Sequence, residues 1–204
     1  MVLSATYRAS AGDFVHTVQA LTPAQLAAPV PACPAWSVHD LLAHQAGASS
    51  DVVHRNLDGV ATPPWTARQV EDRRQRSRSE LVQEWQGNVD AVAPLCDVIP
   101  GPNPAWDVAV HLADLREALD LEPPPPEQGW AEVLAAATAL LQDQAGVRVS
   151  VAEHAPDPGS TTWHVRTGYG LWRALFSRLG DADLEREVLR GSAARLRTVA
   201  FLRG

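Results

Sequence analysis

The amino-acid sequence predicts a mainly α-helical protein, in which a four-helix bundle is followed by a small α+β domain. Hydrophobic residues recur at helical spacing through four segments of the first 122 residues, which is typical of a bundle. β-Branched residues then gather in two short runs between residues 147 and 165, as strands require. Four consecutive prolines at 123–126 separate the two parts, because such a run forms a stiff spacer and not a helix.

The first two predicted helices are joined by a proline-rich stretch. Residues 4–21 place four large apolar side chains on one helical face, namely Tyr7, Phe14, Val18 and Leu21. Residues 21–34 contain four prolines, which predicts an extended connector with a short turn. The second helix starts at a capping box, in which Ser37 is the cap and Asp40 its partner, and it should run to about residue 56.

The third and fourth helices complete the predicted bundle. The third should begin after Pro63-Pro64 and end near residue 94, with an inner seam of Val70, Ser77, Leu81, Trp85, Asn88 and Val92. Its arginine-rich run at 73–78 lies among acidic residues, so we interpret it as a solvated face with ion pairs inside this one helix. The fourth helix opens at Asn103-Pro104, a cap followed by proline, and continues to about residue 121.

The predicted domains are therefore a bundle over residues 1–122, a proline-rich linker at 123–129 and an α+β domain over 130–204. In the last domain, residues 130–144 form an alanine-rich helix. Residues 147–151 and 161–165 should pair as a hairpin around a Pro/Gly turn. Residues 169–179 and 183–202 return to helical spacing.

The composition argues against several classes of function. The 204 residues contain 17 basic residues, all of them arginine, and the net charge is −7. The lack of lysine excludes Schiff-base catalysis and a phosphate-binding loop, and the acidic balance argues against a nucleic-acid partner. We see neither a secretory start nor an apolar run near the roughly 20 residues that span a bilayer. We expect a cytoplasmic protein without a membrane partner.

Three side chains stand out as candidate metal ligands: His44, Asp107 and His111. Asp107 and His111 are four residues apart on the fourth predicted helix, so they share one face. His44 lies on the inner stripe of the second, and both histidines lie about 10 to 12 Å beyond their helix caps. Two imidazoles and a carboxylate would leave a coordination position open, as in catalytic zinc sites. Spacing alone fits equally a core histidine and a helix-surface pair without metal, so both interpretations stay open.

Neighbouring residues also have two interpretations each. Asp114 could accept a hydrogen bond from an imidazole N–H or form a surface ion pair with an arginine. Trp36 is interpreted as a core residue that packs on the helix start, and His39 should face away from His44. Cys33 reads as a small buried hydrophobe, although a thiol so near a metal helix could be reactive.

Two stretches carry a family resemblance. The run from Cys33 to His44 matches the pattern Cys-Pro-x-Trp-(Ser/Thr)-Val-x-Asp-Leu-x-x-His throughout, and the run from Asp107 to Leu119 contains His-x-x-Asp-Leu-Arg-x-Ala-Leu. Over roughly residues 5–125 the chain resembles the mycothiol-dependent maleylpyruvate isomerase family, which belongs to the DinB-like metal-binding four-helix bundles. That family usually has glutamate at the position of Asp107, and aspartate is one methylene shorter.

The resemblance implies a cofactor, a cosubstrate and a reaction class. It implies a divalent metal ion, with zinc expected, held by His44, Asp107 and His111. It also implies mycothiol as the thiol cosubstrate, and isomerisation or thiol transfer on a small electrophilic substrate. The open alternative is a non-catalytic DinB-like protein that keeps the bundle to bind a metal or another ligand.

Overall fold

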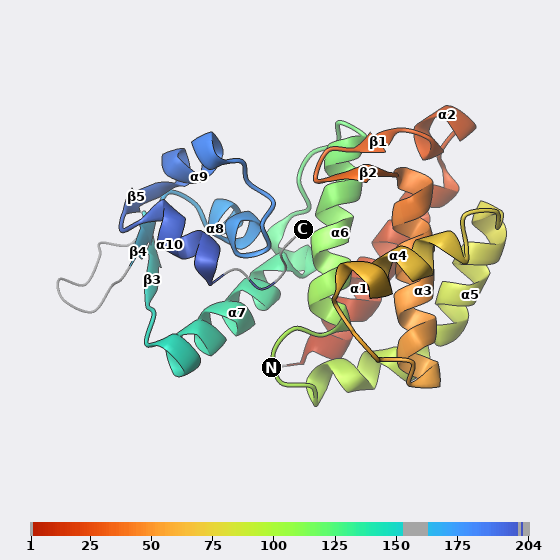
Figure 1. Cartoon of the computed structure of the whole chain (residues 1–204), viewed down its shortest axis with the longest axis horizontal. Helices are drawn as coiled ribbons and strands as arrows, with labels where there is room; N and C mark the ends of the chain where they lie inside the picture. Colours follow the sequence, from red (N-terminus) through yellow and green to blue (C-terminus); the bar gives the residue numbers. More distant parts are fainter. Residues whose placement is uncertain (1, 153–162, 200, 202–204) are drawn as a thin grey trace. The chain divides into compact units, whose positions relative to one another are not determined.

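The computed structural model describes residues 2–152, 163–199 and 201 (Figure 1). The chain divides into two compact units, Met1–Gly129 and Trp130–Gly204. The first is a helical bundle and the second a smaller α+β unit, so the predicted mainly α fold class is confirmed. The predicted linker region lies at the end of the first unit, where η2 (Pro126–Gln128) forms a single 3₁₀ turn.

Four helices form the bundle of the first unit: α1 (Leu3–Gln19), α3 (Val38–His54), α5 (Arg78–Val92) and α6 (Pro104–Ala118). α3 packs mainly on α5 and α1 mainly on α6, while α3–α6 and α1–α5 contacts close the ring (Figure 1). Side chains from all four helices fill the interior, and each buried one stabilises the fold by about 1.5–3 kcal/mol. The largest are Phe14, Leu41, Leu42, Leu81, Trp85, Trp106, Leu112 and Leu115.

The two helices that carry the candidate ligands begin at the predicted caps. Ser37 Oγ accepts a hydrogen bond from the backbone N–H of Asp40 at 3.2 Å, and the Asp40 carboxylate accepts one from the backbone N–H of Ser37 at 3.0 Å. The Asn103 side chain accepts one from the N–H of Ala105 at 2.9 Å. These caps satisfy N–H groups that have no partner inside the helix, and they fix where α3 and α6 start.

The prediction of one continuous third helix is wrong. The structure contains two helices there, α4 (Pro63–Glu71) and α5, which begins only at Arg78. Ser77, which we had placed on the inner seam, is the cap of α5 and forms a capping box with Glu80. A serine followed three residues later by glutamate can start a new helix, and this local signal prevails over the helical spacing.

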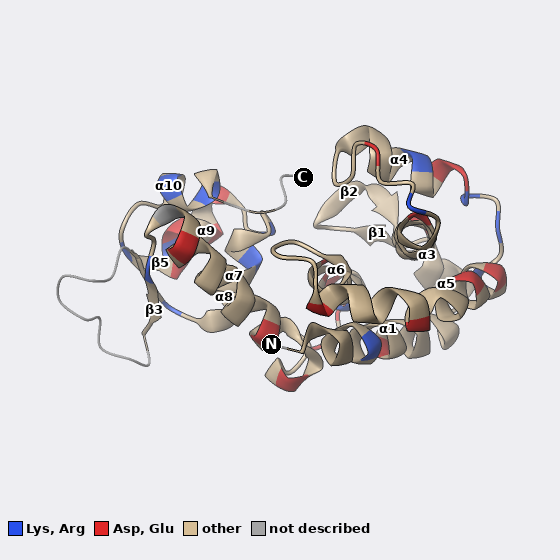
Figure 2. Ribbon diagram, turned by 90° about the horizontal axis from the view of Figure 1, so that it is seen from below, with Lys and Arg blue, Asp and Glu red and all other residues tan. Residues whose placement is uncertain are grey.

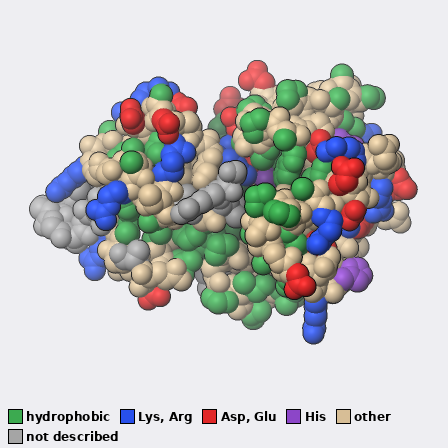
Figure 3. All heavy atoms as spheres, viewed as in Figure 1, with side chains coloured by type: hydrophobic (Ala, Val, Ile, Leu, Met, Phe, Trp, Pro, Cys, Tyr) green, Lys and Arg blue, Asp and Glu red, His purple; other side chains and the backbone are tan. Residues whose placement is uncertain are grey.

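The arginines of the α4–α5 connection form ion pairs, but mostly not within one helix as predicted. Arg73 and Arg76 both pair with Glu84 on α5, and Arg73 Nη2 lies 2.7 Å from its carboxylate. Arg78 donates to the backbone oxygens of Val18 and Leu21 at the end of α1. Basic and acidic residues alternate along the ribbon here in Figure 2, and Figure 3 shows their side chains interspersed on the surface of this part of the unit. The connection is therefore anchored to the bundle.

The predicted extended connector is a small β-ribbon preceded by a helical turn. After α2 (Pro23–Leu26), β1 (Pro29–Val30) pairs in antiparallel fashion with β2 (Cys33–Ser37). The prediction of helices and an unpaired extended connector over residues 1–122 is therefore wrong in this segment. Prolines exclude a helix here but tolerate the edges of a two-stranded ribbon. β2 runs directly into α3, so the ribbon holds its side chains beside the start of that helix.

The predicted hairpin of the second unit is also wrong. β3 (Val149–Val151) pairs in parallel with β4 (Trp163–Val165), and β4 pairs in antiparallel fashion with β5 (Val188–Arg190). The described helices around this sheet are α7 (Trp130–Ala145), α8 (Gly168–Leu175), α9 (Asp181–Glu187) and α10 (Ala193–Thr198). β5 interrupts the helix predicted over 183–202. Its residues pair with the edge of β4 that β3 does not occupy, so they are extended and not helical.

The helices of the described residues include none that is long and apolar enough to cross a membrane.

α4 lies across α3 at a glycine (Figure 1). A Cβ atom on Gly47 would be 2.6 Å from Gln69 Cβ and 2.9 Å from its Cγ. We expect Gly47→Ala to destabilise the fold by roughly 1–3 kcal/mol, because α4 must shift. Gly87→Ala on α5 is the matched control, since nothing lies within 4 Å, and it should stabilise by about 0.5–1 kcal/mol. Urea unfolding of both variants measures the difference, and effects of the same sign would contradict the close approach.

Candidate metal centre

The structure brings the three candidate ligands together between α3 and α6. His44 projects from α3, and Asp107 and His111 project from successive turns of α6. His44 Nε2 lies 3.4 Å from Asp107 Oδ2, and His111 Nε2 lies 3.5 Å from Asp107 Oδ1. The two imidazole centroids are 4.9 Å apart. A group of one ligand atom from each residue lies within 4.8 Å, so these residues could hold a metal ion.

The carboxylate marks the side on which this group opens to solvent. The side chains of His44 and His111 are 3% and 5% exposed, whereas that of Asp107 is 28% exposed. Gln45 Nε2 donates a hydrogen bond of 2.7 Å to Asp107 Oδ2 and so fixes the carboxylate. A small molecule would therefore reach the group past Asp107.

A hydrogen-bond chain from α4 sets the tautomer of His44. Gln69 Nε2 donates to Asp51 Oδ2 at 2.8 Å, and Gln69 Oε1 lies 2.8 Å from His44 Nδ1. An ionised carboxylate only accepts hydrogen bonds, so the amide N–H must face Asp51 and the amide oxygen must face His44. His44 Nδ1 therefore carries a hydrogen, and Nε2, which faces Asp107, is the nitrogen left to bind a cation.

Asp114 has the same effect on His111. Its carboxylate is fully buried, and Oδ2 lies 3.0 Å from His111 Nδ1. Of the two interpretations made from the sequence, the structure shows the contact with the imidazole. The hydrogen is again held at Nδ1, which leaves the Nε2 lone pair on the Asp107 side.

Two lone pairs and a carboxylate thus converge on one point, and such an arrangement requires a positive charge at its centre. A proton on each Nε2 would join that ring to one carboxylate oxygen, whereas a single metal ion can bind all three groups at once. One ligand atom from each residue lies within 4.8 Å of the others, and atoms about 2.1 Å from a tetrahedral zinc ion are about 3.4 Å apart, so small side-chain movements would close the three donors on an ion. The donor set and its spacing therefore fit a zinc ion with one coordination position left open.

The ionisation of the group agrees with that assignment. Burial opposes the charge on Asp107, but the positive charge of the facing imidazoles when they are protonated, with hydrogen bonds from His44 and Gln45, outweighs it and holds the pKa of Asp107 well below its usual range; a metal ion among the three groups would supply the same positive charge. Burial lowers the pKa of His111, although Asp107 and Asp114 oppose this shift. The carboxylate is therefore ionised and His111 neutral at neutral pH, which are the forms that bind metal ions.

The shorter aspartate side chain still reaches both histidines. Asp107 lies in the first turn of α6, one turn before His111, and each of its oxygens faces one imidazole. Its position near the helix N-terminus also favours the negative charge. The change from the usual glutamate therefore leaves the donor group intact.

A family comparison places the first unit. Residues 7–106 match the family model described as the mycothiol maleylpyruvate isomerase N-terminal domain. This part of the chain belongs to that family. The match includes His44 and ends one residue before Asp107, so the donors of α6 rest on the geometry described above. Comparisons with curated proteins and with solved structures gave no match.

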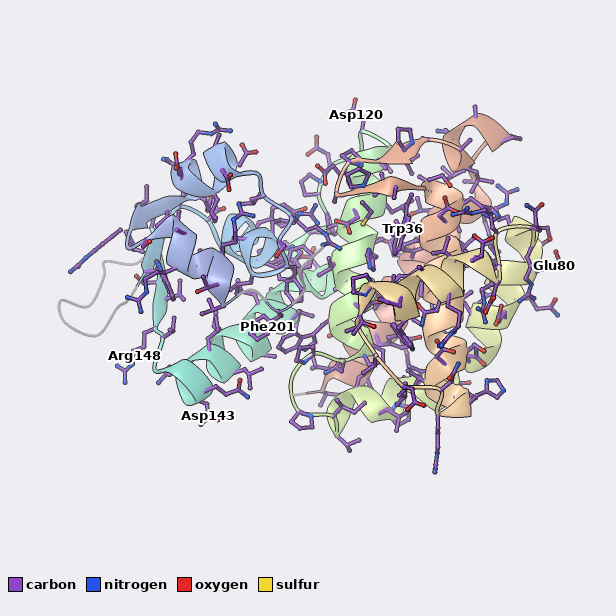
Figure 4. All side chains as sticks on the ribbon, viewed as in Figure 1. Trp36, Glu80, Asp120, Asp143, Arg148 and Phe201 are labelled. Carbon is purple, nitrogen blue, oxygen red and sulfur yellow. The ribbon has the colours of Figure 1, made fainter. Side chains whose placement is uncertain are left out.

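The family's Cys-Pro-x-Trp pattern contributes a residue to the site that sequence reasoning missed. The Trp36 ring on β2 lies 5.1 Å from the His44 ring and 6.0 Å from the His111 ring, measured between centroids (Figure 4). It is only partly buried, so it forms a wall of the site as well as part of the packing. Its place in a pattern that ends at His44 was the available signal.

Gln69 and Asp51 also belong to the site but gave no signal in the sequence, whereas His39 is not part of it, as the sequence predicts. Gln69 and Asp51 act on His44 from positions that only the packing of α4 on α3 brings together. His39 Nε2 lies 2.9 Å from the backbone oxygen of Arg76 and faces away from the donors, as predicted.

We expect Gln69→Met to lower zinc affinity by about 10–100-fold, because His44 loses the partner that fixes its tautomer. The Asn56→Ala variant is the control, since Asn56 also donates to Asp51, at 2.9 Å, without touching His44. Competition with a chromogenic chelator measures both affinities. Equal affinities in the two variants would show that Gln69 does not act through His44.

Proposed function

We propose that the first unit binds one divalent cation, zinc, through His44, Asp107 and His111, and uses it to activate a low-molecular-weight thiol. The observation that carries the proposal is the convergence of two Nε2 lone pairs and a carboxylate, with both imidazoles held at Nδ1. The family description supports mycothiol as the thiol and isomerisation as one reaction of the class.

The surrounding residues have distinct roles in this proposal. Gln69 and Asp114 orient the two imidazoles, and Gln45 fixes the Asp107 carboxylate at the open side. The Trp36 indole covers both rings and keeps water from that face. These contacts hold the donors in place before the ion arrives, so little reorganisation is needed on binding.

A bound zinc ion would supply the ionisation of the thiol, whose pKa of about 8.5 leaves most of it protonated at neutral pH. The partly exposed side at Asp107 admits a small electrophilic substrate beside that sulfur. If the thiolate adds to an activated double bond and leaves after rotation about the single bond, the product is an isomer. If it stays, the product is a thioether.

Metal content is the first test of this proposal. Protein purified without chelator should contain about one equivalent of zinc, and His44→Ala and His111→Ala should each lose nearly all of it, because two remaining donors hold zinc poorly. His54→Ala is the control, since His54 lies exposed on α3. Elemental analysis gives the content and circular dichroism the helicity. Unchanged zinc content in both ligand variants would show that these residues do not form the metal site.

Thiol binding is the second test. Calorimetry of mycothiol on zinc-loaded protein should show binding with release of about one proton at pH 7, because the thiol ionises. Asp107→Ala protein and the alcohol analogue of the thiol are the two controls, and neither should give this signal. A scan of small electrophiles then identifies the reaction. If neither mycothiol nor another small thiol binds the zinc-loaded form, the protein belongs to the non-catalytic alternative.

A further inference from the structure

A second group of metal-binding side chains lies beside the first. One ligand atom each from Cys33 on β2 and from His111 and Asp114 on α6 lie within 4.8 Å of one another. His111 and Asp114 are buried, and Cys33 is partly buried. His111 belongs to both groups, whereas His44 and Asp107 belong only to the first.

The two groups use different sides of one imidazole. His111 Nε2 faces Asp107 at 3.5 Å, and Nδ1 faces Asp114 at 3.0 Å. The two nitrogens of an imidazole ring point in divergent directions, so an ion bound at Nδ1 lies apart from an ion bound at Nε2. Because Asp114 lies at Nδ1, we assign the Cys33 group to a separate position on the Asp114 side of the ring.

The donors of this position differ in chemical preference from those of the first. The first group offers nitrogen and oxygen, whereas the second adds a cysteine sulfur. Thiolate ligands favour soft or borderline cations such as Cd²⁺, Cu⁺ and Zn²⁺. The backbone of Cys33 is held in position, because it pairs with Val30 in the ribbon and because its strand continues into the cap of α3.

We propose that Cys33, Asp114 and Nδ1 of His111 form a second cation position, selective for thiophilic metal ions. A neutral imidazole has one lone pair, so His111 can serve only one of the two positions at a time. A thiophilic ion at Cys33 therefore removes a ligand from the first position and releases the ion held there. The second position involves no small thiol and stands apart from the catalytic role, whereas the release of an ion from the first position rests on the metal binding proposed above.

Cobalt titration of the His44→Ala variant tests the second position with the first one disabled. With a phosphine as the reductant, we expect a thiolate-to-cobalt charge-transfer band that saturates at a single equivalent. The band should vanish when Cys33→Ser is added and persist when Cys96→Ser is added, Cys96 being the buried second cysteine. A missing band, or one that survives Cys33→Ser, overturns the proposal.

Asp107→Asn provides a second background in case His44→Ala fails to fold, because this change keeps the size of a partly exposed side chain. The same band is expected there. If it forms only in wild-type protein and in neither background, Cys33 serves as an added ligand of the first position and the proposal is wrong.

Cadmium added to zinc-loaded wild-type protein tests the shared imidazole. We expect each bound Cd²⁺ to release one Zn²⁺, and Cys33→Ser to raise the cadmium needed. Binding of cadmium with all the zinc retained would overturn the coupling. A cobalt band in His44→Ala together with wild-type protein that binds no zinc would refute the proposed function but support the second position.

Discussion

The hydrogen bond between His44 Nδ1 and Gln69 Oε1 connects the packing of the bundle to the chemistry of its centre. It exists because Gly47, which lies one turn after His44, lets α4 lie close on α3. Asp51, one turn further on, holds the other end of the amide. One face of α3 therefore carries His44, the space at Gly47 that admits Gln69, and Asp51, which holds the Gln69 amide. A substitution at Gly47 or Asp51 therefore alters the position of Gln69, and through its hydrogen bond the orientation of the His44 imidazole.

The sequence predicts those parts of the fold and site that depend on local signals. Capping residues mark the starts of α3 and α6, and the spacing of four residues places Asp107 and His111 on one face of α6. The depth of His44 along α3 adds the third residue. The structure places these caps and side chains as predicted because helix geometry is regular, so that residue number translates into position without knowledge of the tertiary packing.

The remaining features depend on contacts between segments distant in sequence. Gln69 acts on a histidine 25 residues before it, and only the break at 72–77 lets α4 turn back across α3. β5 completes a sheet with β4 although its residues have helical spacing. The sequence predicts a core position for Trp36 and leaves Cys33 as either a buried hydrophobe or a reactive thiol, because an extended segment before a helix gives no sign of what its side chains face. Tertiary packing decided each of these cases.

The difference between the two imidazoles has a chemical consequence. His44 is held by a neutral amide, whereas His111 is held by a buried carboxylate. An amide oxygen is a weak metal ligand, so Gln69 can only orient its ring. The Asp114 carboxylate can accept a hydrogen bond from the Nδ1 hydrogen of His111. Once that hydrogen has left, the carboxylate and Nδ1 can bind one cation together, and Cys33 is near enough to be its third ligand. In the proposal made above, the bundle therefore gives His44 a single role and His111 two.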